Sequence, residues 1–193
     1  FIKDYVGALV KFHNEGIPVP RLKKHVEGYL WKVPGRNNSY LCVMEYFLGK
    51  SLRELGVTDT DLFAIAKIVG KINTMHFSVK ADYDSWGVTN VIKEFSKNKK
   101  YLEAADLALV KPVVAQFAKQ NFSAFKKSVV HGDFQREHVL KSSSDRYCVI
   151  DLGCLAYDVS IFDLGIFIGE FCIDIESSRL RKILKKIVDA YTS

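Results

Sequence analysis

The sequence lacks several features that mark common protein classes. Among its 193 residues no apolar run approaches the roughly 20 residues that a membrane-spanning helix needs, and its start has no signal-peptide pattern. Cysteine is scarce, and Cys42, Cys148, Cys154 and Cys172 do not have zinc-finger spacing. Three of them stand in strand-like or apolar surroundings, so we expect free thiols in a reducing compartment. These absences predict a cytoplasmic protein without a transmembrane segment.

The charge is unbalanced, with 28 Lys and Arg against 22 Asp and Glu, for a net charge of +6. The basic residues gather near 97–100, 126–127 and 179–186. Solvated helix faces are the simpler explanation. The alternative is attraction to an anion such as a nucleotide, a phosphorylated substrate or a membrane surface. No base-stacking motif of the RNA-binding kind is present, so we expect no nucleic acid partner.

One stretch, residues 129–153, concentrates the chemistry and reads VVHGDFQREHVLKSSSDRYCVIDLG. Three serines and an aspartate separate two apolar runs, which predicts a β-hairpin that turns at the serines. Such a hairpin brings Asp133, His138 and Asp151 to one end, although a one-residue change of register would move every side chain to the other face. Two carboxylates held close on loops favour a base plus a divalent cation such as Mg²⁺. The plainer alternative is an ordinary hairpin with a surface aspartate at each end.

The motif HGDFQREHVL…VIDLG resembles the catalytic loop and metal-binding motif of the aminoglycoside phosphotransferase and choline kinase family, small-molecule relatives of the protein kinases. The resemblance implies that Asp133 is the catalytic base and that Asp151 holds the metal ions that bridge the phosphates. His138, the second candidate metal ligand, stands where the family usually has Asn, and imidazole is a poorer magnesium ligand than an amide oxygen. Asp163, in FDLG, resembles the family's structural aspartate that holds the catalytic loop.

Two segments of the N-terminal part resemble the same family. GIPVPRL, at 16–22, resembles the stretch after the helix beside the nucleotide, and YLCVMEYFLGKSL, at 40–52, resembles the last small-lobe strand and the hinge. The resemblance implies that adenine forms hydrogen bonds with backbone groups around Glu45, Tyr46 and Phe47. The alternative interpretation of this apolar run is a buried strand without a binding role.

The family's glycine-rich phosphate loop and its strand-borne lysine are missing from the sequence, in which no G-x-G-x-x-G occurs. The resemblance places both before residue 1. We therefore expect a piece of a longer protein that is weak or inactive by itself. The family's first helix also carries a glutamate that pairs with this lysine. Asp4 and Tyr5 stand near its place, and the role stays unassigned.

Hydrophobic periodicity predicts the remaining elements. The clearest helix spans 59–77; Thr58 or Asp59 caps its start, and His76 lies at its end. The other predictions are helices over 1–15, 51–55, 91–101, 104–125 and 176–191, strands over 28–33 and 40–47, a loop over 81–88, and core positions for Phe95, Tyr101, Phe117, Phe122 and Phe125.

Together these features predict an α+β, protein-kinase-like fold. A remnant of the N-terminal β lobe would occupy residues 1–48, and a mainly helical C-terminal lobe with the catalytic hairpin residues 49–193. The predicted function is an ATP-dependent phosphotransferase, a kinase that uses ATP and Mg²⁺ to phosphorylate a hydroxyl of a small metabolite or antibiotic. The alternative is a weak or inactive pseudokinase-like domain that binds a nucleotide or a partner. The substrate and the oligomeric state stay open, although the net positive charge disfavours a polycationic aminoglycoside.

Overall fold

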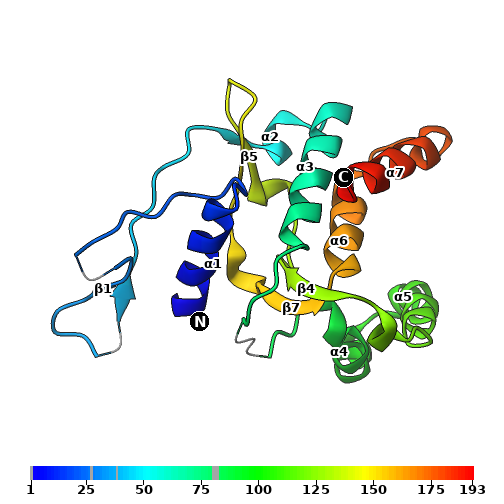
Figure 1. Cartoon of the computed structure of the whole chain (residues 1–193). Helices are drawn as coiled ribbons and strands as arrows, with labels where there is room; N and C mark the ends of the chain where they lie inside the picture. The colour runs from blue at the N-terminus through cyan, green and yellow to red at the C-terminus, as the bar shows by residue number, and fades with distance from the viewer. Residues whose placement is uncertain (1, 27, 38, 80–82) are drawn as a thin grey trace.

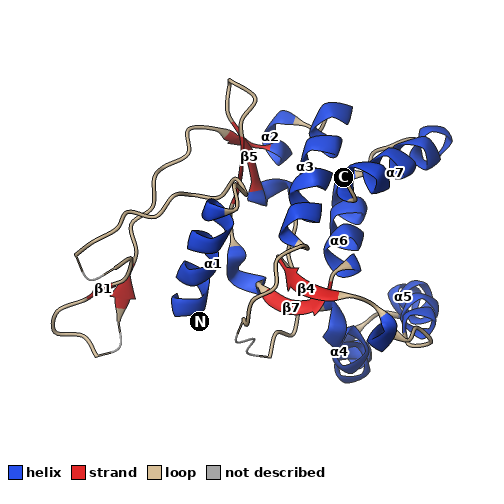
Figure 2. Ribbon diagram, in the orientation of Figure 1, coloured by secondary structure: helices blue, strands red, loops and turns tan. Residues whose placement is uncertain are grey.

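The computed structural model describes residues 2–26, 28–37, 39–79 and 83–193 (Figure 1). Residue 1 of the predicted first helix and residues 81 and 82 of the predicted loop lie outside this described part. Figure 2 shows helices combined with short strands, which confirms the predicted α+β class. None of the described helices is long and apolar enough to cross a membrane.

The elements follow one another along the chain with short sheets between helices. The helices are α1 (Ile2–Asn14), α2 (Leu52–Leu55), α3 (Asp59–Ile72), α4 (Val91–Asn98), α5 (Ala104–Phe117), α6 (Ile161–Phe171) and α7 (Ser177–Tyr191). The strands are β1 (Trp31–Lys32), β2 (Tyr40–Leu41), β3 (Lys50–Ser51), β4 (Lys127–Val130), β5 (Val139–Lys141), β6 (Tyr147–Val149) and β7 (Ala156–Val159). The strand β5 lies between β3 and β6 in one sheet, while β1 pairs with β2 and β4 with β7, all antiparallel. The helices α1, α2, α4 and α7 fall within their predicted ranges.

The helix α3 runs through the hydrophobic core, with α1 on one side and α6 and α7 on the other (Figure 1). Its apolar stripe is buried as predicted, and burial of such a stripe is the main source of helix stability in a protein. The largest fully buried side chains include Phe12, Leu62, Ile65, Ile72, Phe134, Leu152, Phe167, Phe171 and Ile187. All four cysteines are free, as predicted.

The helix α3 begins as predicted but ends early. Thr58 is the N-cap: its hydroxyl accepts a hydrogen bond from the Asp61 N–H, and the Asp61 carboxylate accepts one from the Thr58 N–H. The helix stops short of its predicted end, so His76 lies in a loop. The chain turns there because Asn73 is buried and its amide donates to the Val129 carbonyl at 3.0 Å.

The predicted buried strand over 40–47 is wrong in both length and burial. The strand β2 covers only its first two residues, and beyond it a single bridge joins Met44 to Leu22. Several of its apolar side chains are exposed, and Tyr46 is 87% exposed. The reason is that the β1–β2 hairpin projects away from the helices (Figure 1). The strand predicted over 28–33 likewise shortens to the two residues of β1.

The predicted aromatic core between residues 95 and 125 is also wrong. The helix α5 ends at Phe117 and contains Pro112 in its interior. Phe117 and Phe122 stack with ring centroids 4.5 Å apart, yet both are only half-buried. Tyr101 is 75% exposed and Phe125 is 41% exposed. These rings are not buried because α4 and α5 lie at the periphery, away from α3 (Figure 1).

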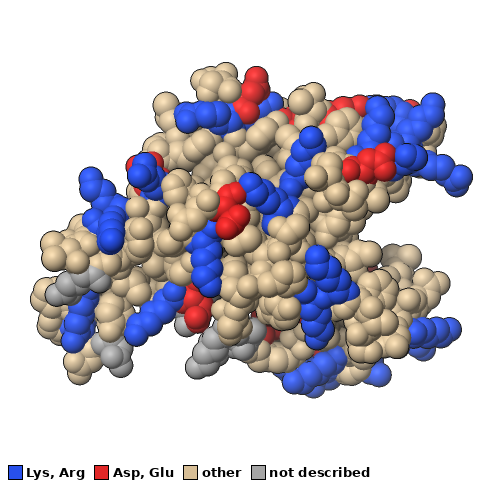
Figure 3. Space-filling model, in the orientation of Figure 1, with Lys and Arg blue, Asp and Glu red and all other residues tan. Residues whose placement is uncertain are grey.

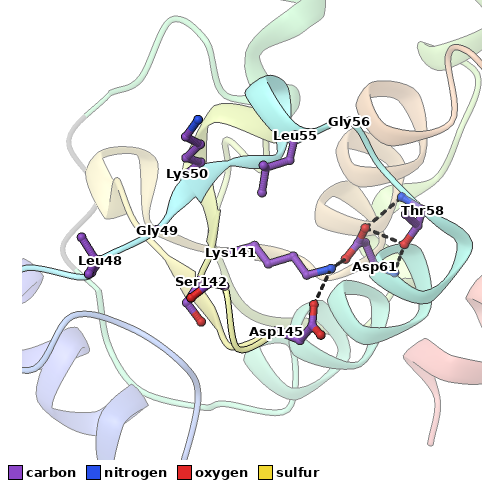
Figure 4. A pocket seen from close by; sticks show the side chains of 11 residues that line it. Leu48, Gly49, Lys50, Leu55, Gly56, Thr58, Asp61, Lys141, Ser142 and Asp145 are labelled. Carbon is purple, nitrogen blue, oxygen red and sulfur yellow. Dashed lines mark hydrogen bonds and ion pairs between the residues drawn. The ribbon is translucent and has the colours of Figure 1, made fainter.

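The β5–β6 hairpin forms as predicted, and Asp61 of α3 anchors its turn end. Lys141 and Tyr147, paired across the hairpin, donate to Asp61 Oδ1 at 2.8 and 2.6 Å. Figure 4 shows Lys141 reaching Asp61 and also Asp145, at 3.0 Å, beside a cavity of about 670 Å³. Burial raises the pKa of Asp61, but hydrogen bonds from Lys141, Thr58 and Tyr147 outweigh it and lower the pKa from 3.8 to about 2.

We expect acid to weaken the fold through Asp61. Because the pKa of Asp61 is lower in the folded than in the unfolded chain, its ionised form contributes about 2 kcal/mol above about pH 4, and this contribution is lost as the pH falls toward 2. Asp61→Asn should lower the free energy of unfolding at pH 7 by about 2–4 kcal/mol and flatten its dependence between about pH 4 and pH 2. Urea unfolding over a pH series measures both effects.

Asp59→Asn is the matched control, since it removes an exposed carboxylate from the first turn of the same helix. This substitution should lower the free energy of unfolding by less than about 1 kcal/mol. An equal loss in both variants would show that Asp61 is not an anchor.

Candidate functional site

The hairpin brings together the three acid and imidazole side chains predicted from its motif. The Ile150 N–H donates to the His138 carbonyl at 2.9 Å and thereby closes the open end of the hairpin. His138 lies between two carboxylates: Nδ1 is 3.6 Å from Asp133 Oδ2, and Nε2 is 3.5 Å from Asp151 Oδ2. The two acids therefore meet at one end of the hairpin, as the sequence predicts.

The hydrogen bonds of His138 define its neutral tautomer. Nδ1 lies 2.8 Å from the carbonyl oxygen of Asp133, which can only accept, so Nδ1 carries the proton. Nε2 then presents its lone pair toward Asp151. Asp133 Oδ1 accepts a hydrogen bond from the Gln135 amide at 2.5 Å, which orients the carboxylate with Oδ2 beside the imidazole.

Asp151 has an unusual backbone conformation, with φ 61° and ψ 66° in the left-handed region. Such strain in a residue other than glycine gathers at functional sites. Oδ1 accepts the Gly153 N–H at 3.2 Å, and the side chain is 58% exposed and accessible to a ligand. Burial, then the charges of Cys42 and Asp151, raise the pKa of Tyr5 on α1.

A buried network lies beneath residues 131–133, the loop that carries Asp133. Asp163, fully buried on α6, accepts the backbone N–H groups of His131 at 2.7 Å and Gly132 at 2.9 Å. It also accepts the Asn73 amide at 2.9 Å. Burial raises the pKa of Asp163; the charge of His131, followed by these hydrogen bonds, opposes the increase without cancelling it. The prediction that Asp163 holds the backbone of this loop is therefore confirmed.

His131 is a member of the site that the sequence analysis does not identify. Its ring is fully buried; Nε2 lies 3.0 Å from the Ile150 carbonyl, and Nδ1 accepts the Asp133 N–H at 3.3 Å. Burial lowers the pKa of His131, which keeps the ring neutral, with its proton on Nε2. The ring thus links the backbone of Asp133 to the residue before Asp151. The sequence feature that could have identified His131 is its position directly between an apolar strand and Gly-Asp.

The β4–β7 sheet, which was not predicted, sets residues 131–133 against the segment after Asp151. Val130 pairs with Ala156 at its end. Gly132 has φ 81°, and a Cβ there would collide with the backbone carbonyl of Cys154. Only glycine fits both the backbone conformation and this close approach.

The predicted adenine-binding residues directly precede β3 of the β3–β5–β6 sheet and lie outside the acid cluster of Asp133, His138 and Asp151. The Glu45 N–H donates to a backbone carbonyl, that of Arg21, at 2.8 Å. Tyr46 is exposed and Phe47 is half-buried. Directly after them β3 pairs with β5, so the predicted hinge is joined to the hairpin. A cavity of about 580 Å³ is lined by residues 45–48 together with 16–21 and 146–148.

A second cavity, of about 510 Å³, adjoins the acids through Gly132 and Gly153. Its walls come from the loop at 83–90, from β7 and from the first turns of α6. Asp84 and Asp158 place two half-buried carboxylates in these walls. The sequence pattern indicates no function for either residue, because acids in loops and edge strands are ordinary surface residues.

The Cys154 thiol lies where this cavity meets the acid cluster. Burial raises its pKa to about 11, and the charges of Asp84 and Asp133, followed by that of Asp151, act in the same direction. Lys127 also lines the cavity. The junction is thus acidic although the chain carries a net charge of +6.

The acid cluster is not a complete metal cage. Within the part of the chain that the structure describes, no group of three or more His, Cys, Asp or Glu side chains is arranged to hold an ion. Asp151 and His138 offer a carboxylate oxygen and an imidazole nitrogen. This pair fits an ion that takes its other ligands from water and substrate phosphates, as Mg²⁺ usually does.

Comparison with known proteins identifies the family. The family model described as "Phosphotransferase enzyme family" matches residues 2–186. The chain belongs to the phosphotransferase enzyme family. No curated protein matches its sequence closely enough to count as a relative.

Solved structures of phosphotransferases and kinases share the fold of this chain. An aminoglycoside-3'-phosphotransferase of type VIII is 17% identical, with a TM-score of 0.59 over 98% of this chain and 72% of that one. A microcompartment-associated aminopropanol kinase is 16% identical, with a TM-score of 0.68 over 98% of this chain and 63% of that one. Choline kinase LicA from Streptococcus pneumoniae is also 16% identical, with a TM-score of 0.60 over 96% of this chain and 61% of that one. The chain therefore has the predicted protein-kinase-like fold and spans 61% to 72% of the length of these proteins.

We expect Asp163→Asn to lower the free energy of unfolding by about 2–4 kcal/mol, because the new NH₂ group would face a backbone N–H and leave buried donors unpaired. Urea unfolding at pH 7 measures the change. Asp158→Asn, which alters a half-buried carboxylate on β7, is the control and should cost less than about 1 kcal/mol. Equal stability of the two variants would mean that the Asp163 network does not hold the loop.

Proposed function

We propose that this phosphotransferase is a small-molecule kinase that transfers the γ-phosphate of ATP to a hydroxyl group. The observation that carries the proposal is the placement of Asp133 and Asp151 on either side of His138 at one end of the hairpin. Phosphoryl transfer requires little covalent chemistry from a protein and depends mainly on positioning and charge neutralisation. Two acids on loops held by buried hydrogen bonds suit both tasks.

Each residue has a proposed role in this reaction. Asp133 orients the acceptor hydroxyl and takes its proton on Oδ2, the oxygen beside the imidazole. Asp151, with His138 next to it, would hold Mg²⁺, which neutralises phosphate charge when bound. Backbone groups around Tyr46, with Glu45 and Phe47 on either side, would bind adenine.

Structures of similar fold support the use of a nucleotide. Amicoumacin kinase hAmiN, with a TM-score of 0.68, was solved with AMP-PNP, Ca²⁺ and Ami, and LicA, with a TM-score of 0.60, was solved with AMP. We extend the proposal to a division into an N-terminal lobe remnant, 1–48, and a helical lobe, 49–193. A cytoplasmic location, suggested by the free cysteines, belongs to the same proposal.

A pseudokinase-like domain that binds a nucleotide or a partner without transfer is the competing candidate. One feature favours it: His138 stands in the place where the family usually has Asn. Binding of ATP with no turnover would support this candidate.

The acceptor is proposed to occupy the cavity beside Gly132 and Gly153. Asp84 and Asp158 in its walls favour a hydroxyl compound that carries positive charge. This local preference for a cationic acceptor is the opposite of the expectation from the net positive charge of the whole chain, which disfavours a polycationic aminoglycoside.

We expect Asp133→Asn to reduce phosphotransfer by about 10²–10⁴-fold, because the amide cannot take a proton, while ATP binding stays within about twofold. ATP turnover and calorimetric ATP titration measure the two quantities. Asp189→Asn, an exposed carboxylate on α7, is the matched control and should leave both unchanged. Equal turnover by wild type and Asp133→Asn would remove Asp133 from the mechanism.

We expect the wild-type chain to bind 1-amino-2-propanol more tightly than uncharged 1,2-propanediol. Asp158→Asn should weaken binding of the amine roughly fivefold, since one partly screened charge contributes about 1 kcal/mol, and leave the diol unchanged. Ligand titration by NMR measures both affinities. Asp145→Asn, at the turn of the hairpin, should change neither. Equal affinity of the wild type for the two alcohols would contradict the proposed charge preference.

A further inference from the structure

The helix α5 is apolar on every side and is nevertheless exposed. Its polar residues Asp106, Lys111 and Gln116 fall on three different sides, so it has no polar face. A helix of this kind is normally buried, yet Val114 is the one buried residue among its fourteen, all of which the structure describes. Leu109 is 73% exposed. Exposed apolar surface of this kind marks a site of contact with a protein or a membrane.

A groove of about 540 Å³ lies between α4 and α5. Phe95 of α4 and Phe117 of α5 form part of its lining. Two other residues that line it are exposed: Trp86 by 87% and Val113 by 66%. Both helices lie at the edge of the molecule (Figure 1), so the groove and the exposed side chains form one apolar surface that faces solvent.

Lysines border this apolar surface. Residues 91–127 contain eight lysines and three acids, in a chain with a net charge of +6. All eight are exposed: Lys93, Lys97, Lys99, Lys100, Lys111, Lys119, Lys126 and Lys127. Within the described residues, Lys97 lies 3.9 Å from Glu94, and the other seven have no carboxylate within ion-pair distance. Figure 3 shows basic side chains around an uncharged area where α4 and α5 lie. Unpaired positive charge of this density attracts an anionic surface.

We propose that the α4–α5 face, which comprises Trp86 and residues 91–117, binds the surface of a membrane that contains anionic lipids. The apolar side chains enter the interfacial region, and the lysine ammonium groups contact the lipid headgroups. Trp86 and Tyr101, which is 75% exposed, suit this region because tyrosine and tryptophan combine an apolar ring with a polar group. The inference goes beyond the proposed phosphotransfer and does not depend on it.

An acidic protein partner or a second copy of the chain is the first alternative. Interfaces between proteins are poor in lysine and alanine, whereas α5 contains four alanines and its surroundings are rich in lysine. A second copy would bring the same excess of positive charge and would be repelled. Lysine combined with exposed leucine, tryptophan and tyrosine is instead the composition of surfaces that lie in the membrane interface.

Simple attraction of a basic protein to an anionic surface is the second alternative. In that case the lysines contact the headgroups while the apolar side chains stay in water, and salt screens the whole interaction. The two explanations differ in the surroundings of Trp86 in the bound state. An indole ring that leaves water emits at shorter wavelength, and Trp31→Phe removes the signal of the second tryptophan in the chain.

The experiment uses the whole 193-residue chain without nucleotide, and vesicles of phosphatidylcholine with or without about 30% phosphatidylserine. Co-sedimentation should show at least about tenfold tighter binding to the vesicles that contain phosphatidylserine. In Trp31→Phe, the emission of Trp86 should shift to shorter wavelength when these vesicles are added.

Two double variants separate the apolar from the basic contribution. Leu109→Gln combined with Val113→Gln should weaken binding to the phosphatidylserine vesicles about tenfold, because it removes exposed apolar side chains from α5. Lys99→Gln combined with Lys100→Gln should also weaken binding about tenfold. All four positions are exposed, so circular dichroism should show an unchanged fold.

The matched controls lie in the segment around β1, which Figure 1 places at the opposite end of the molecule from α4 and α5. Val26→Gln replaces an apolar side chain that is 94% exposed. Lys24→Gln combined with Lys32→Gln removes two exposed positive charges. Both controls should bind the vesicles within about twofold of wild type, since these charges lie beyond the screening distance of roughly 8 Å.

Equal binding to both kinds of vesicle, or no binding to either, would overturn the inference and leave an acidic protein as the occupant of the α4–α5 face. Binding without a shift of the Trp86 emission would overturn it in favour of simple charge attraction. Should the Leu109 and Val113 variant prove unfolded, the Lys99 and Lys100 variant and the Trp86 emission still decide the question. Since no nucleotide is present, none of these results bears on the proposed function.

Discussion

The hydrogen bonds that Asp163 accepts hold the loop that carries Asp133 in place. One carboxylate binds two successive backbone N–H groups of the loop and the amide of Asn73. Asn73 in turn accepts the Tyr191 hydroxyl at 2.9 Å. Because Asp163 lies on α6, Asn73 directly follows α3 and Tyr191 ends α7, three helices and the loop share one buried polar network. A buried polar group without a partner costs more free energy than a single bond contributes, so this network permits one loop geometry.

The β5–β6 hairpin separates the interactions that stabilise the fold from those available for chemistry. At the turn end Lys141 and Tyr147 point toward Asp61 of α3. At the open end His138 lies in the short 3₁₀ turn Arg136–His138 before β5, between Asp133 and Asp151. The anchor at Asp61 can therefore be buried and ionised without using the side chains that face Asp151. A firm anchor also lets the strained backbone of Asp151 persist.

Sequence patterns were sufficient wherever local interactions determine the structure. The turn of the hairpin, the Thr58 cap and the apolar stripe of α3 are local, and all three are predicted correctly. The prediction of a buried strand over 40–47 is wrong, because an apolar run in the sequence does not show whether another element covers it. The contacts of Asp61 with the hairpin join residues 80 and 86 positions apart, and no local pattern indicates such pairs. The two acids predicted from the motif lie close together because a local turn determines how the hairpin strands pair. That pairing brings residues that are distant in the sequence to the same end of the hairpin.

The net charge of the whole chain does not indicate the local charge of the site, because electrostatic fields in salt solution are short-ranged. Figure 3 shows Lys and Arg spread over one face, with several at the α7 corner. At physiological ionic strength exposed charges interact over roughly 8 Å, so basic residues elsewhere on the surface do little to offset the acids around Cys154. On the proposed function, these acids repel a triphosphate unless a divalent ion accompanies it, and they attract a cationic acceptor. The same local charge would then make nucleotide binding dependent on metal and acceptor binding selective for positive charge.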